Sequence, residues 1–169
     1  EIDNISLERY SGSNHAVLDG GNIRSKSLAT IIRELKVDHS DLSLLVTDVD
    51  GFDWDVIRSA VELLKHKPYI YFECFSDNQS QLQNFKDLFR QLKALGYTNF
   101  VFFDNFGAHV STLDALDQID SLLDYVAAQN FYKLTRTIYY YDVLAFTTNK
   151  ADEITKIIQD YSARHYTVE

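Results

Sequence analysis

The chain of 169 residues contains no methionine and only one cysteine, one proline, one tryptophan and six glycines. A single thiol, Cys74, cannot form an internal disulfide and is typical of a reducing compartment, so we expect a cytoplasmic protein. A chain of this length, with one proline and no low-complexity tract, predicts a single domain over residues 1–169. Because the chain begins with Glu1 and lacks methionine, we expect it to be a processed or excised piece of a longer protein.

Long apolar runs and clusters of basic side chains are also lacking. No run approaches the roughly 20 apolar residues that cross a bilayer, so no membrane partner is expected. Acidic side chains outnumber basic ones by 25 to 16, and the net charge of −9 argues against a nucleic-acid partner. The six glycines form no phosphate or dinucleotide cradle. The five histidines lack the spacing of zinc ligands, so no metal ion is expected from them.

Strand-like and helix-like segments alternate along the chain. The composition of buried strands is found in residues 42–49, 69–75, 99–103 and 138–147. Apolar residues at helical spacing predict helices over residues 27–37, 53–66, 78–95, 112–129 and 149–164. The first 26 residues are expected to be irregular, with a short strand near residues 14–18 and a turn at residues 19–21. The alternation predicts an α/β fold with a mainly parallel sheet and helices on both faces.

Polar residues follow directly after three of these strands. In parallel sheets, ligands bind beyond the carboxyl ends of the strands. The candidate site residues are therefore Asp48, Asp50, Glu73, Asp104 and Asn105.

Four carboxylates lie within the eight residues from Asp48 to Asp55. Like charges at this density raise one another's pKa unless a cation or another partner is present. An alternative interpretation is helix capping, because acids are stabilised at a helix N-terminus; it suits Asp53 and Asp55 better than Asp48. An EF-hand calcium loop is excluded, because apolar residues would occupy its first and last ligand positions.

The strand at residues 69–75 carries one acid and the only thiol. Glu73 lies near the expected ligand edge and is either an exposed strand-end residue or a functional acid. Cys74 should point to the opposite side of the strand, and no histidine is placed to activate it, so we expect a core residue.

The stretch after the first strand resembles phosphatases of the haloacid dehalogenase type, which have an apolar strand followed by Asp-x-Asp-Gly. The resemblance implies a nucleophilic Asp48, an acid/base Asp50, and a magnesium site with Ser76 and Asp104 nearby. Two features depart from that family. Phe52 replaces a small hydroxylated residue, and a helix follows at once, without room for an inserted flap.

A longer stretch resembles the FkbM-type methyltransferases. The resemblance rests on Ser27-Leu-Ala-Thr-Ile-Ile-Arg-Glu-Leu35, Leu44-Leu-Val-Thr-Asp-Val-Asp-Gly-Phe-Asp53, Val56-Ile-Arg-Ser-Ala60, Glu62-Leu-Leu64 and Lys67-Pro-Tyr-Ile-Tyr-Phe-Glu73. It covers roughly residues 25–75, and more loosely the later order of strands and helices. Thr47 replaces a common lysine, and Asp50 replaces the commoner glutamate.

This resemblance implies a seven-stranded, Rossmann-like sheet that uses S-adenosylmethionine to methylate a hydroxyl group of a sugar, a polyketide or a similar small molecule. Asp48, Asp50 and Glu73 are then candidates for the base or for substrate ligands, and Gly51 for the turn nearest the cofactor. The family's cofactor-binding strands would precede Glu1. We therefore expect the C-terminal portion of such a domain, paired with the missing N-terminal half or with another chain.

Three functions stay open on the sequence alone. The first is the methyltransferase, which would act on a small-molecule or carbohydrate acceptor. The second is the magnesium-dependent phosphatase. The third is a non-catalytic, acidic α/β interaction module, because half a sheet leaves an open edge and an exposed apolar face.

Overall fold

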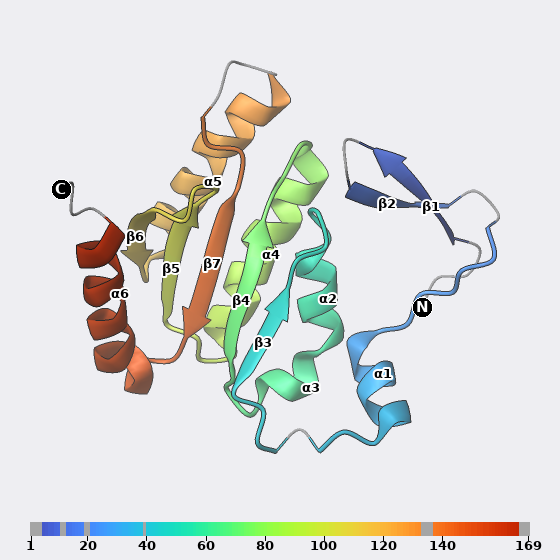
Figure 1. The fold of residues 1–169 in the computed structure, drawn as a ribbon, viewed down its shortest axis with the longest axis horizontal. Helices are drawn as coiled ribbons and strands as arrows, with labels where there is room; N and C mark the ends of the chain where they lie inside the picture. The colour runs from blue at the N-terminus through green and yellow to red at the C-terminus, as the bar shows by residue number, and fades with distance from the viewer. Residues whose placement is uncertain (1–4, 11–12, 19–20, 39, 133–136, 166–169) are drawn as a thin grey trace.

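The computed structural model describes residues 5–10, 13–18, 21–38, 40–132 and 137–165, and shows a five-stranded open sheet with helices on both faces (Figure 1). The sheet order is β3 (Leu44–Thr47), β4 (Tyr69–Cys74), β7 (Tyr141–Phe146), β5 (Asn99–Asp104) and β6 (His109–Leu113). The helices are α1 (Leu28–Leu35), α2 (Asp53–Ser59), α3 (Val61–Leu64), α4 (Gln79–Ala94), α5 (Leu116–Phe131) and α6 (Ala151–His165), with a 3₁₀ turn η1 (Thr148–Lys150) before α6.

The α/β class is confirmed, but the expectation of a mainly parallel sheet is wrong. Only β3 and β4 pair in parallel, because β7 lies between β4 and β5 and runs antiparallel to both, and β6 is antiparallel to β5. When a strand is apolar on both faces, its composition does not indicate whether it runs parallel or antiparallel to its neighbours. Because β7 is antiparallel to β4 and to β5, the three strands β3, β4 and β5 run in the same direction.

Most predicted elements are present with shifted ends. Ser27 caps α1 by accepting a hydrogen bond from the Thr30 N–H, and the helix predicted over residues 53–66 divides at Ala60 into α2 and α3. The helix predicted from residue 112 begins at Leu116, because β6 occupies the preceding segment. The sequence also missed β1 (Ile5–Tyr10), which pairs only with β2 (Ser13–Leu18). Residues 19 and 20 of the expected turn lie outside the described residues.

One face of the sheet carries most of the core. Strand residues that alternate inward, such as Phe72, Cys74 and Phe102, pack against apolar side chains of α2, α3, α4 and α5. Cys74 is buried there, as predicted. Figure 1 shows these helices gathered on one side of the sheet, so this layer holds the strands and positions their ends.

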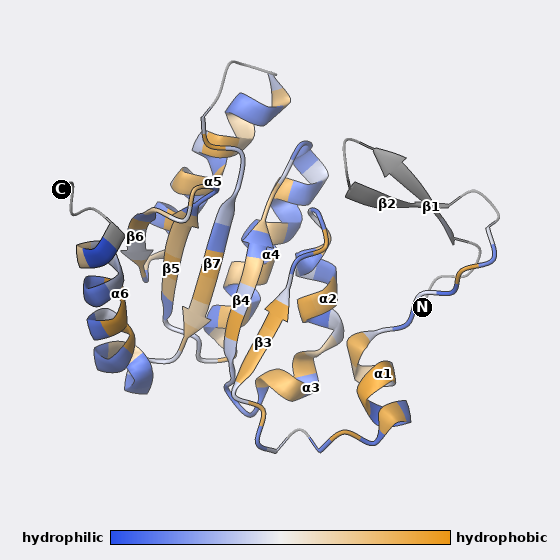
Figure 2. Cartoon of the chain, in the orientation of Figure 1, coloured by the Kyte–Doolittle hydropathy of each residue, from blue (hydrophilic) through white to orange (hydrophobic). Residues whose placement is uncertain are grey.

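The opposite face is only partly covered. There α6 packs Ile154 against Val101 and Phe146, over β5 and β7. At the edge of the sheet, Leu44 and Val46 of β3 remain 49% and 58% exposed. In Figure 2, β3 is predominantly hydrophobic, although none of the described strands pairs with its outer side. Within the described residues, β3 therefore forms an open edge that carries exposed apolar side chains.

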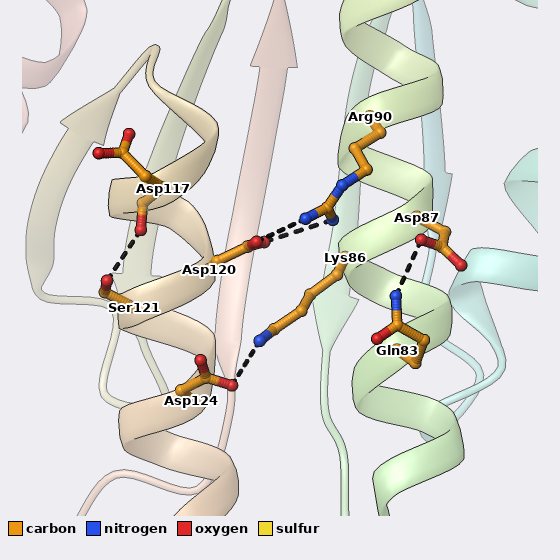
Figure 3. A network of polar contacts seen from close by, with 8 residues as sticks. All are labelled: Gln83, Lys86, Asp87, Arg90, Asp117, Asp120, Ser121 and Asp124. Carbon is orange, nitrogen blue, oxygen red and sulfur yellow. Dashed lines mark hydrogen bonds and ion pairs between the residues drawn. The ribbon is translucent and has the colours of Figure 1, made fainter.

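Helices α4 and α5 are joined by two ion pairs between their facing sides (Figure 3). Lys86 Nζ lies 2.5 Å from Asp124 Oδ1, and Arg90 Nη2 lies 2.6 Å from Asp120 Oδ2. Both pairs lie beside the buried apolar residues through which α4 and α5 pack on the sheet. In the described part of the chain, no helix has both the length and the apolar character needed to span a bilayer.

Candidate functional site

The strand ends that the sequence singled out meet at one edge of the sheet. The carboxyl ends of β3 and β4 lie side by side, because Thr47 pairs with Phe72 in the parallel register. The amino end of β7 lies at the same edge, since β7 runs in the opposite direction and Asp142 pairs with Glu73. This reversal brings acids from three separate segments together.

The turn between β3 and α2 is tied down by Asp53. Its fully buried carboxylate accepts hydrogen bonds from Thr47 Oγ1 at 3.0 Å and from the Val49 N–H at 3.3 Å. Burial raises the pKa of Asp53, and the bond from Thr47 opposes that rise. Asp53 therefore lies in the first turn of α2, where the capping interpretation placed it, but its side chain bonds to the turn before the helix and does not cap the helix.

Gly51 is required by the packing of the turn itself. It has a φ of +90°, and its carbonyl accepts a hydrogen bond from Trp54 Nε1 at 3.1 Å. A Cβ atom here would lie 3.1 Å from Gln81 Nε2 and 3.4 Å from the carbonyl oxygen of Phe75. The glycine thus lets the turn pass close to the end of β4. Its assignment to cofactor binding stays a prediction.

Glu73 is the most perturbed acid at this edge. The side chain is half-buried, and desolvation is the main reason that the pKa of Glu73 rises to about 8. The negative charges of Asp48, Asp53, Asp50 and Asp142 add to this rise. With this pKa, the protonated form of Glu73 predominates at neutral pH. A positive charge placed nearby would lower the pKa and favour the ionised form.

Asp48 and Asp50 flank this glutamate from the turn after β3. Asp48 is exposed, whereas Asp50 is half-buried in a left-handed conformation with a φ of +50°. Both charges raise the pKa of Glu73. The structure thus brings together the three acids that the sequence selected as catalytic candidates.

Asp142 and Tyr71 belong to the same edge but were missed by the sequence analysis. Burial raises the pKa of both groups, that of Tyr71 to about 12, and the negative charge of Asp142 adds to the rise for Tyr71. A polar residue at the start of a strand was not considered, because the sheet was expected to be parallel. The signal available was the run Tyr139-Tyr-Tyr-Asp142, an acid set directly before an apolar segment.

Asp104 and Asn105, at the carboxyl end of β5, accept hydrogen bonds from backbone N–H groups. Asp104 Oδ1 accepts hydrogen bonds from the backbone N–H groups of Phe106 and Ala108, both at 2.9 Å. Asn105 Oδ1 accepts one from the Tyr139 N–H at 2.9 Å. Asp104 therefore stabilises the connection between β5 and β6. The phosphatase resemblance had implied a different role for it, near a magnesium ion.

Asp48, Asp50, Glu73 and Asp142 together form an acidic edge of the sheet, which fits a positively charged group better than a phosphate. Its carboxylates would repel an anion, and no cluster of three or more His, Cys, Asp or Glu side chains suited to a metal ion occurs within the described residues. The Asp-Val-Asp-Gly turn also leads directly into α2, as the sequence indicated. We found no matching family model, no similar curated protein and no matching solved structure for this chain.

Proposed function

We propose that the protein is an S-adenosylmethionine-dependent methyltransferase that methylates a hydroxyl group of a small molecule. In this proposal the described sheet is the C-terminal portion of a Rossmann-like methyltransferase sheet. The sequence resemblance over residues 25–75 supplies the class. The observation that carries the proposal is the position of Glu73, a half-buried acid among other acids at the common edge of β3 and β4, where burial and the neighbouring charges raise its pKa.

Glu73 is suited to act as the base. S-adenosylmethionine supplies an electrophilic methyl group attached to a positively charged sulfur atom. A positive charge near Glu73 would lower the pKa of its carboxyl group and favour the ionised form. Ionised Glu73 would then accept the proton of the acceptor hydroxyl, while Asp48 and Asp50 offset the charge of the cofactor.

The open side of β3 is the place for the cofactor-binding half in this proposal. The unpaired outer edge of β3 offers backbone groups to a further strand, and the exposed Leu44 and Val46 offer apolar surface to a further helix. That half would come from another segment of the polypeptide or from another chain. It would bring the cofactor to the same edge as Glu73.

Calorimetric titration of the full-length protein with S-adenosylmethionine tests the proposal. In buffers of different ionisation enthalpy, we expect binding near neutral pH to release protons, because the cation lowers the pKa of Glu73. Glu73→Gln should still bind the cofactor but release fewer protons. S-adenosylhomocysteine, which lacks the positive charge, is the matched ligand control and should release fewer protons from the unchanged protein.

Absence of binding at millimolar concentration would overturn the proposal. Magnesium-dependent hydrolysis of an aryl phosphate that is abolished by Asp48→Asn would also overturn it and identify a phosphatase instead.

A further inference from the structure

A pocket on the partly covered face of the sheet lies beside the acidic edge. It has a volume of about 250 Å³ and opens between α6 and strands β4, β5 and β7. Tyr71, Phe103 and Leu144 form its sheet side, and Ile157, Ile158 and Tyr161 form part of its helix side. The pocket therefore lies on the face opposite the main core.

The walls of this pocket are apolar and aromatic. The ring of Phe103 meets that of Tyr161 edge-on, with centroids 5.9 Å apart. The Tyr161 hydroxyl donates a hydrogen bond to the Gly107 carbonyl at 2.7 Å. Because this hydroxyl is engaged and most of the other lining side chains are apolar, the walls favour hydrocarbon and aromatic surface over a sugar with many hydroxyl groups.

Strand register places the acids at one end of the pocket. Tyr71 pairs with Leu144, and two residues further along β4 Glu73 pairs with Asp142, on the same face of the sheet. Two residues of a strand span about 7 Å, comparable to the length of one six-membered ring bearing a substituent. A ring in the pocket would therefore extend its substituent toward Glu73.

We propose that this pocket holds the ring of the methyl acceptor, and that the acceptor is a small, uncharged, phenol-like compound whose hydroxyl group reaches Glu73. The inference rests on the proposed function. The volume suits a single substituted ring, since a cavity of about 150 Å³ already admits benzene. The acids at its end accept a hydrogen bond from a phenol but repel a carboxylate or a phosphate.

Binding of p-cresol to the protein, followed by NMR in the absence of cofactor, tests this inference. We expect millimolar or tighter binding, with nuclear Overhauser contacts from the cresol ring to the methyl groups of Ile157 and Ile158. The anionic analogue 4-hydroxybenzoate should bind at least about tenfold more weakly.

Ile157 is half-exposed on α6, so Ile157→Asp should keep the fold and weaken cresol binding at least about tenfold. Gln159→Asp, at an exposed position of the same helix outside the pocket, is the matched control and should bind as the unchanged protein does.

The inference is overturned if p-cresol does not bind, if it contacts other residues, or if 4-hydroxybenzoate binds equally well. Unchanged binding by Ile157→Asp would also overturn it, and the Overhauser contacts decide the matter if that variant does not fold. Because no cofactor is present, a failure here is distinct from a failure to bind S-adenosylmethionine.

Discussion

At the scale of single residues, Glu73 makes the stability of the protein depend on pH. Its carboxyl group has a reference pKa of 4.5 and a pKa of about 8 in the folded protein. Between these values the folded state binds more protons than the unfolded state, so the free energy of unfolding falls as the pH rises. Above the pKa of about 8 in the folded protein, Glu73 is ionised in both states, and the free energy of unfolding no longer changes with pH because of this residue.

Glu73→Gln is therefore expected to remove this slope and to make the protein more stable than the unchanged chain above pH 8. The gain should be about 1–2 kcal/mol, since water reaches part of the side chain and screens the penalty. Urea unfolding at a series of pH values measures it. Asp142→Asn is the companion variant: it removes one negative neighbour, so the slope should persist but end at a lower pH. An unchanged slope in Glu73→Gln would contradict the prediction.

Gly51 and Gly96 form a matched pair for testing the turn. Both have a φ of +90°, but a Cβ atom at Gly51 would crowd Gln81 and Phe75, whereas at Gly96 the nearest atom is Lys67 Nζ at 3.8 Å. Gly96→Ala should cost about 1 kcal/mol of stability through backbone strain alone. Gly51→Ala should cost about 2–3 kcal/mol, because crowding is added. Thermal and urea unfolding compare them, and equal losses would show that the close approach at Gly51 is unimportant.

At the scale of elements, two ion pairs join the neighbouring helices α4 and α5. A double-mutant cycle on Arg90→Ala and Asp120→Ala should give a coupling energy of about 0.2–1 kcal/mol. The coupling should decrease at high salt, because water and ions reach this pair. Stability here comes mainly from the buried apolar sides of both helices. A coupling that is larger and insensitive to salt would be inconsistent with this assignment.

Element prediction succeeded where local chemistry decides and failed where pairing decides. Ser27, predicted as a cap, accepts a hydrogen bond from the Thr30 N–H, and Asn78, the first residue of another predicted helix, accepts one from the Gln81 N–H. Asn149, also predicted as a cap, lies instead inside the 3₁₀ turn before α6. In contrast, β6 was missed, and its last two residues, Thr112 and Leu113, were assigned to the start of a helix. Its short segment is stabilised by pairing with β5, a contact that no local pattern contains.

At the scale of the whole molecule, β3 forms one edge of the sheet, and none of the described strands pairs with its outer side. We expect the isolated chain to associate through β3, either with a second copy or with the cofactor-binding half. Val46→Lys should abolish this association while changing the stability of the monomer by less than about 0.5 kcal/mol, because Val46 is largely exposed. Analytical ultracentrifugation and urea unfolding provide the two measurements.

Tyr125→Lys supplies the control for that variant. Tyr125 is also exposed, but it lies on α5, away from β3, so its substitution should leave association intact. A chain that stays monomeric at high concentration and unfolds cooperatively would contradict the prediction.

The sequence by itself determined the α/β class, a turn at Gly51 between a strand and a helix, the buried thiol and three candidate acids near the ends of two strands. These follow from local periodicity, capping and the alternation of side chains along a strand, which neighbouring residues encode. Only the tertiary structure decided that β7 lies antiparallel between β4 and β5, which places Asp142 opposite Glu73. It also decided that the face beside them holds an apolar pocket under α6. Strand direction and burial depend on contacts between segments far apart in the chain, so the pKa of Glu73 is a property of the fold.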